Sequence, residues 1–272
     1  MRTRIISGAV GVLILIVVLI FHKTVVLPIA AAFIIAVMLY ELLRAVKLEK
    51  CIPVLIAAEL CGVAMPFIAE ITFKYPNLST ILSFGVTLFA AFVIFVTWLR
   101  KHKELRYEQI FFALAVMILV PQAMSTIVRI DRAFNDGSAW IAYTGAYFTG
   151  VALGKHKLCP EISPKKTIEG FAGGIVTTGL VYAIAFSVHN GFSVGTVVIW
   201  FVVGAVCAVI GTVGDLSASM VKRQIGFKDY GKIMPGHGGL MDRFDSVLFV
   251  LPTFYTFLIM TPLVYVVPDY IG

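Results

Sequence analysis

Long apolar runs separated by short polar segments dominate the chain. A helix needs about 20 mostly apolar residues to cross a bilayer. Runs near that length occupy residues 5–21, 24–46, 52–69, 78–99, 109–130, 170–188, 194–213 and 247–267. A ninth run, 138–153, is shorter and less apolar. The pattern predicts an all-α fold, a polytopic integral membrane helical bundle with about nine transmembrane helices.

Composition supports a membrane environment. Hydrophobic residues make up 60% of the 272 residues and charged residues only 14%, whereas soluble domains average about 25% charged residues. The net charge of +7 would suggest nucleic acid as a partner of a soluble protein. Here Lys and Arg lie between apolar runs, as in loops that face anionic lipid headgroups. We therefore expect membrane lipids, and no nucleic acid, as partners.

The distribution of Lys and Arg among the loops indicates that the short ninth run also crosses the bilayer. The polar loops 44–51, 100–108, 154–169 and 214–246 hold 16 of the 22 Lys and Arg residues. If 138–153 crosses the bilayer, all four loops share one face, as the positive-inside rule requires. We therefore expect a multi-pass protein of the plasma membrane, with these loops in the cytoplasm.

The same arrangement suggests two regions. Residues 1–137 are expected to form about five N-terminal transmembrane helices. Residues 138–272 are expected to form the catalytic transmembrane region, with loops 154–169 and 214–246. Within the apolar runs, Glu41 and Glu70 lie near span ends and are expected to reach water. Glu59 lies deeper, where an ionisable residue is a functional candidate by default.

The loop 214–246 combines the side chains that phosphate chemistry uses. Carboxylates bind Mg²⁺, Lys and Arg neutralise phosphate oxygens, and glycines let backbone N–H groups approach an anion. An ordinary charged loop is the alternative, but the turn 235–239, with a histidine among glycines, favours a site. The loop contains Asp215, Asp229, Asp242, Asp245, Lys222, Arg223, Lys228, Lys232, Arg243, Gly236, His237, Gly238 and Gly239.

The loop 154–169 is a second candidate anion site. Pro160 and Pro164 keep it non-helical, and Ser163 or Thr167 is expected to cap the helix that follows. Lys165 and Lys166 then lie beside a helix N-terminus, which favours anions. A solvated basic loop against anionic lipid is the alternative for this segment.

The spacing of the polar residues resembles a known signature. The pattern Ser219-x-x-Lys222-Arg223-x(4)-Lys228-Asp229-x-Gly231-x(3)-Pro235-x-His237-Gly238-Gly239-x-x-Asp242-Arg243-x-Asp245 is similar to that of phosphatidate cytidylyltransferases, or CDP-diacylglycerol synthases. The segments 162–170 and 145–150 resemble the same family, and the resemblance covers about residues 143–250. It departs at Tyr143, where the family usually has an Asp, in a span that is shorter than in the family.

The resemblance implies a reaction and roles for residues. CTP and phosphatidic acid would give CDP-diacylglycerol and pyrophosphate. The enzyme would need Mg²⁺, and a monovalent cation such as K⁺ is a further candidate cofactor. It would form a homodimer. Asp215 and Asp242 would bind the metal, and Lys222 and His237 would complete the catalytic set. Substrate binding would involve Ser163, Pro164, Lys165, Lys166, Thr167, Ser219, Arg223, Lys228, Asp229, Gly238, Gly239, Arg243 and Asp245.

Two other functions remain as alternatives. A CDP-alcohol phosphotransferase would have Asp-Gly followed by Ala-Arg and spaced Asp residues, and Asn135-Asp136-Gly137 is not followed by that pattern. A transporter with a cytoplasmic cation site would distribute polar residues through several spans. Here they concentrate in two loops, which favours the transferase.

Overall fold

The computed structural model describes residues 2–133, 156–231, 233 and 238–260. These belong to two compact units: one comprises Met1–Arg132 and Ile225–Phe244, the other Ala133–Gln224 and Asp245–Gly272. The predicted span 138–153, with Tyr143, lies outside the described residues, as does His237.

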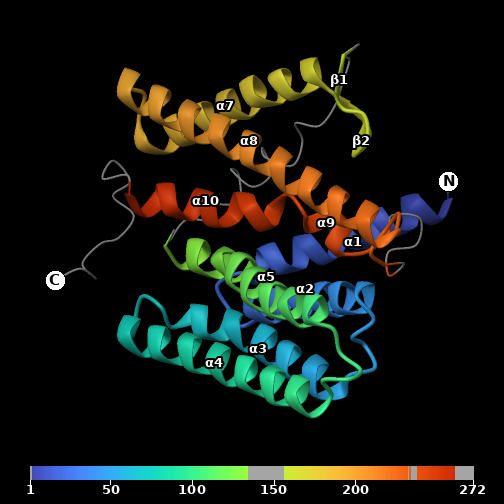
Figure 1. Cartoon of the computed structure of the whole chain (residues 1–272). Coiled ribbons are helices and arrows are strands. Elements are labelled where there is room, and N and C mark those ends of the chain that lie inside the picture. The colour runs from blue at the N-terminus through green and yellow to red at the C-terminus, as the bar shows by residue number, and fades with distance from the viewer. Residues whose placement is uncertain (1, 134–155, 232, 234–237, 261–272) are drawn as a thin grey trace. The chain divides into compact units, whose positions relative to one another are not determined.

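The first unit is built from membrane-length helices (Figure 1). Its elements are α1 (Arg2–Ile20), α2 (Val26–Ala45), α3 (Ile52–Glu70), α4 (Pro76–Arg100), α5 (Tyr107–Ala133) and the short α9 (Met241–Phe244). Helix α3 packs against both α2 and α4, and its contacts bury Ile35, Leu39 and Val54 completely. Helix α4 instead exposes Phe84 and Phe89 at 69% and 70%, which suits lipid rather than water.

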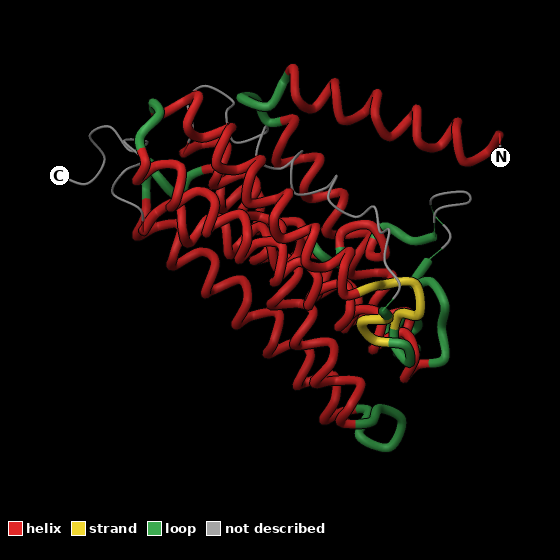
Figure 2. Tube along the Cα trace, turned by 90° about the horizontal axis from the view of Figure 1, so that it is seen from above, coloured by secondary structure: helices red, strands yellow, loops and turns green. Residues whose placement is uncertain are grey.

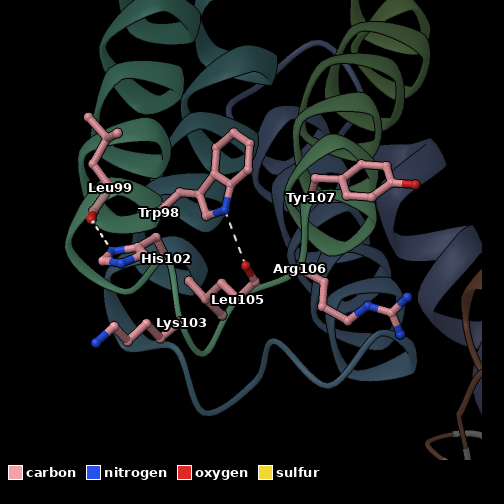
Figure 3. A pocket seen from close by; sticks show the side chains of 7 residues that line it. All are labelled: Trp98, Leu99, His102, Lys103, Leu105, Arg106 and Tyr107. Atoms are coloured by element: carbon pink, nitrogen blue, oxygen red, sulfur yellow. Dashed lines mark hydrogen bonds between the residues drawn. The ribbon is translucent and has the colours of Figure 1, made fainter.

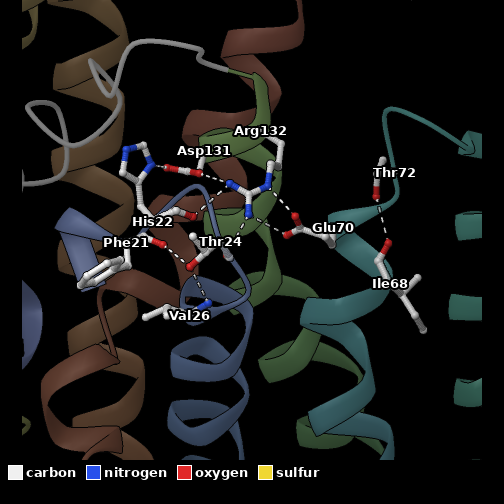
Figure 4. A network of polar contacts seen from close by, with 9 residues as sticks. All are labelled: Phe21, His22, Thr24, Val26, Ile68, Glu70, Thr72, Asp131 and Arg132. Carbon is white, nitrogen blue, oxygen red and sulfur yellow. Dashed lines mark hydrogen bonds and ion pairs between the residues drawn. The ribbon is translucent and has the colours of Figure 1, made fainter. Parts of the chain in front are cut away.

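A polar network joins three helix ends of this unit (Figure 4). Arg132, at the end of α5, makes a bidentate pair with Glu70, from Nε to Oε1 at 2.8 Å and from Nη2 to Oε2 at 3.0 Å. Its Nη1 donates to Asp131 Oδ2 at 2.7 Å, and Asp131 Oδ1 lies 2.6 Å from His22 Nδ1. Glu70 thus lies near a span end and reaches water, as predicted, since its side chain is 32% exposed, and it also forms an ion pair.

The second unit contains a hairpin and three helices: β1 (Lys157–Cys159), β2 (Ser163–Thr167), α7 (Ile168–Asn190), α8 (Val194–Ile225) and α10 (Val247–Met260). An aromatic cluster holds the helices together. Phe186 of α7 stacks on Trp200 of α8 with ring centroids 3.8 Å apart, and Phe254 of α10 meets Tyr182 edge-on at 5.6 Å. Buried aromatic pairs of this kind contribute about 0.5–1.5 kcal/mol beyond area burial.

The hairpin replaces a predicted irregular loop (Figure 2). Strands β1 and β2 pair antiparallel, with Lys157 opposite Thr167. The prediction that the segment with Pro160 and Pro164 is non-helical is confirmed. Thr167 caps α7, because its Oγ1 accepts a hydrogen bond from Gly170 N at 3.2 Å.

The prediction of a polytopic membrane helical bundle is confirmed. Within the described residues, seven helical segments are long and apolar enough to cross a membrane, and α1 adds the shorter apolar stretch Val10–Ile20. Each of the eight longer predicted runs coincides with a described helix, and residues 261–267 of the last run lie outside the described residues. One boundary differs: α8 continues to Ile225, so the predicted loop 214–246 begins with helix.

Candidate functional site

The last turns of α8 carry the first group of predicted site residues. Asp215 and Ser219 are four residues apart and share a helix face, and Ser219 Oγ donates to Asp215 Oδ1 at 3.5 Å. Residues 216–225 are mostly good helix formers, and the stop signal comes only at Gly226, with φ +80°. Placing these residues in a loop was therefore wrong, because polarity alone does not end a helix.

Asp215 forms an ion pair with a residue of the hairpin. The Nζ of Lys166, on β2, contacts Asp215 Oδ2. The two side chains are 27% and 31% exposed, so water still reaches the pair. One residue from each of the two polar segments predicted from the sequence, 154–169 and 214–246, therefore meets the other within this unit.

A second carboxylate lies beside Asp215. Asp245 is only 7% exposed. Its negative charge is close enough to that of Asp215 for the two to repel each other, and close enough to Lys222 for attraction. The close approach depends on Gly214, because a Cβ there would lie 3.0 Å from Asp245 O and 2.7 Å from Phe249 Cδ2. We call Asp215 and Asp245 the carboxylate pair.

The other unit holds Asp242 in a backbone cradle. Asp242 Oδ2 accepts hydrogen bonds from Tyr230 N at 2.9 Å and from Gly239 N at 3.0 Å. Two N–H donors on one oxygen fix the direction of the carboxylate. Asp229 also lies near this turn, because a Cβ on Gly238 would be 3.4 Å from Asp229 Oδ1.

Glu41 of α2 holds the same turn and was missed as a site residue. Its Oε1 accepts from Leu240 N at 3.0 Å and its Oε2 from Met241 N at 2.8 Å. The expectation that Glu41 reaches water is wrong, since the residue is 2% exposed. Its partners are about 200 positions away along the chain, so local sequence gave no signal beyond a carboxylate in an apolar span.

The remaining predicted residues that the structure describes either are exposed or lie on strand β2. Arg223, Lys228 and Arg243 are exposed, as charged groups that meet a soluble anion need to be. Ser163 and Pro164 lie on β2, as does Lys165, whose side chain is outside the description. The structure thus brings Lys166 and Asp245 to Asp215, and Lys222 to Asp245, in one unit. In the other unit it brings Asp229, Gly238 and Gly239 to Asp242.

The carboxylate pair fits Mg²⁺ in its donor chemistry. Among the described residues, no group of three or more His, Cys, Asp or Glu side chains could enclose a metal. Mg²⁺ does not need such a cage, because it keeps several waters and binds through one or two carboxylates plus substrate phosphates. Asp215 and Asp245 supply two such carboxylates, and their negative charges are close enough to repel each other.

A hollow of about 440 Å³ lies elsewhere, at the turn between α4 and α5 (Figure 3). Its lining includes Trp98, Lys103, Arg106 and Tyr107, with Trp98 Nε1 donating to Leu105 O at 3.2 Å. Aromatic and basic side chains of this kind anchor helices at a membrane surface. None of its lining residues is a predicted site residue.

Fold and site together define a multi-pass membrane protein with acidic and basic groups suited to metal-assisted phosphate chemistry. The chain belongs to the cytidylyltransferase family, whose model matches residues 2–261. The resemblance drawn from the sequence is thereby confirmed.

Curated relatives carry a common name. The chain is 34% identical over 230 residues to a phosphatidate cytidylyltransferase of Bacillus subtilis (strain 168), covering 81% of this chain and 84% of that protein. It is 44% identical over 129 residues to the phosphatidate cytidylyltransferase of Staphylococcus aureus (strain COL), covering 45% and 46%. A third, from Staphylococcus haemolyticus (strain JCSC1435), is 48% identical over 115 residues, covering 42% and 43%.

Proposed function

We propose that this protein is a phosphatidate cytidylyltransferase, which converts CTP and phosphatidic acid into CDP-diacylglycerol and pyrophosphate in phospholipid biosynthesis. The observation that carries the proposal is the carboxylate pair beside Lys166 and Lys222, in a chain of the cytidylyltransferase family. Carboxylates for a divalent cation and ammonium groups for phosphate oxygens are the two parts that such a transfer needs.

The proposed reaction is a single in-line displacement. A phosphate oxygen of phosphatidate forms a bond to the α-phosphorus of CTP. The bond from that phosphorus to the bridging oxygen of the β-phosphate breaks, and pyrophosphate leaves with the electron pair. Because the attacking phosphate is already anionic, no strong general base and no covalent enzyme intermediate are required. Catalysis then consists mainly of positioning and charge neutralisation.

The proposal assigns separate tasks to acidic and basic residues. Asp215 and Asp242 are the proposed metal ligands, and the closeness of Asp245 to Asp215 supports adding it to them. Mg²⁺, when bound, neutralises phosphate charge and polarises the α-phosphorus. Lys166 and Lys222, with the exposed Arg223, Lys228 and Arg243, hold the phosphate oxygens of CTP and phosphatidate. His237 is proposed to orient a phosphate.

The protein is a multi-pass membrane protein, and we propose that its site faces the cytoplasm of the plasma membrane. CTP is a cytoplasmic metabolite, and the loops 154–169 and 214–246 carry much of the positive charge of the chain. A homodimer and a K⁺ requirement stay predictions. Crosslinking in native membranes tests the first, and activity in K⁺ against Na⁺ buffers tests the second.

The direct test of the proposed function is product stoichiometry. Purified protein in detergent micelles is incubated with phosphatidate, CTP and Mg²⁺, with one control that omits phosphatidate. We expect CDP-diacylglycerol, identified by mass spectrometry, and pyrophosphate in equal amounts, and neither product in the control. Release of CMP from added CDP-diacylglycerol and an alcohol, without reaction of CTP, would instead identify a CDP-alcohol phosphotransferase.

A further inference from the structure

Glu41 is a carboxylate within a transmembrane helix, where an ionisable group is costly unless it is well paired. Both of its oxygens accept backbone hydrogen bonds, from Leu240 N at 3.0 Å and Met241 N at 2.8 Å. These donors precede Asp242 directly in the chain. Glu41 thus fastens α2 to the segment that leads into Asp242.

The backbone of this segment is shaped to fit the Glu41 carboxylate. A Cβ at Gly231 would collide with the Glu41 side chain, and a Cβ at Gly239 would lie 2.6 Å from both carboxylate oxygens. Both positions must therefore be glycine for the loop to close around Glu41. The Glu41 carboxylate is thus enclosed by the backbone at Gly231 on one side and at Gly239 on the other.

The same turn connects Glu41 to Asp242. The Gly239 amide donates to Asp242 Oδ2, while the next two amides donate to Glu41. Three consecutive N–H groups are therefore divided between the two carboxylates. The negative charges of Glu41 and Asp242 are close enough to repel each other. Loss of the Glu41 bonds would release the turn that directs Asp242.

We propose that Glu41 is a positioning residue for the reaction: its carboxylate clamps the backbone of 239–241, so that Asp242 is presented in a fixed direction. Glu41 acts through Asp242, and the contacts described for it are to backbone amides. The inference rests on the proposed function in one respect, which is the assignment of Asp242 as a metal ligand. Outer residues that orient metal ligands typically change metal affinity or activity by about 10–100-fold when replaced.

The first measurement examines the clamp without substrate or metal. Hydrogen–deuterium exchange is followed by mass spectrometry on peptides that contain Leu240 and Met241. In Glu41→Gln one acceptor oxygen becomes an NH₂ donor, so exchange at these two amides is expected to accelerate about tenfold or more. The matched control is Glu104→Gln in the turn between α4 and α5, an exposed side chain of the same unit, which makes the same chemical change and should leave this exchange unchanged.

The second measurement separates positioning from charge. Glu41→Asp keeps the charge near Asp242 but withdraws the carboxylate by about 1.5 Å, one carbon–carbon bond, so it cannot reach both amides. We expect the half-saturating Mg²⁺ concentration to rise about 10–100-fold in Glu41→Asp and Glu41→Gln, with little change in the KM for phosphatidate. Glu104→Gln should match wild type.

The outcomes are distinguishable. Unchanged exchange at Leu240 and Met241 in Glu41→Gln would overturn the clamp. Faster exchange with wild-type Mg²⁺ dependence would overturn the positioning role and leave a structural one. If Glu41→Gln does not fold, Glu41→Asp provides both readouts. Failure of wild-type protein to form CDP-diacylglycerol would instead defeat the proposed function, while the exchange result would still decide whether the clamp exists.

Discussion

Lys166 of the hairpin forms an ion pair with Asp215 of α8, which joins two polar segments about 50 residues apart in the chain. Exposed ion pairs contribute little to stability, about 0–1 kcal/mol, and this one is partly open to water. The ion pair therefore matters mainly because it places a lysine beside a carboxylate. This is the arrangement expected where a polyphosphate and its cation bind together.

Lys166→Ala should weaken the use of CTP more than it weakens the fold. Removal of one phosphate-neutralising ammonium is expected to lower kcat/KM for CTP about tenfold or more, which corresponds to about 1.4 kcal/mol. The matched control is Lys157→Ala, which removes an exposed lysine from β1 of the same hairpin. Equal losses in the two variants would show that only the general charge of the hairpin matters.

Gly231→Ala and Glu41→Ala should be strongly coupled. The nearest atoms to a Cβ at Gly231 all belong to Glu41, so alanine at 231 is destabilising while Glu41 is present. In the Glu41→Ala background that collision disappears, and the second substitution should cost little. Thermal unfolding of the four proteins in detergent is expected to give a coupling of about 1 kcal/mol or more. Additive losses would contradict the geometry of the clamp.

Thr167→Ala should destabilise the protein through the start of α7. The threonine hydroxyl accepts the Gly170 amide, and loss of such a cap costs about 1 kcal/mol. Thr167→Ser keeps the acceptor and is the matched control, with an unfolding temperature close to wild type. If serine and alanine at 167 have the same effect, the cap is not the source of the stability.

Arg132→Lys should lower stability without affecting metal dependence. Lysine keeps the charge but cannot reproduce the bidentate pair with Glu70, and it also loses the bond to His22 O. We expect a lower unfolding temperature in detergent and an unchanged half-saturating Mg²⁺ concentration. A marked change in Mg²⁺ dependence would mean that this network takes part in the reaction.

The helices were predictable because membrane spans depend on a simple property, the length of an apolar run. The cap at Thr167 was predictable as well, since capping depends on a few adjacent residues. The helical continuation to Ile225 was not, because the runs were defined by hydropathy, and a polar sequence of good helix formers looks like a loop on that criterion.

The site contacts were harder to predict, because they depend on packing between distant segments. The closeness of Asp245 to Asp215 requires the approach of α10 to α8 at Gly214. The Glu41 clamp joins residues about 200 positions apart. Sequence spacing identified the chemical groups correctly, but only the fold could show that Glu41, set aside as a water-facing residue, holds the backbone next to Asp242.

The measurement that tests the central claim most directly follows two labels of CTP in wild type and Asp215→Asn. Purified protein is incubated with phosphatidate, Mg²⁺ and CTP labelled on either the α- or the γ-phosphorus. The displacement predicts that the α label enters the lipid and the γ label leaves in pyrophosphate. It also predicts that Asp215→Asn lowers both by about 100-fold or more, roughly 2.7 kcal/mol, while the variant unfolds at the wild-type temperature. Transfer of the γ label to lipid, or wild-type activity in Asp215→Asn, would contradict the account.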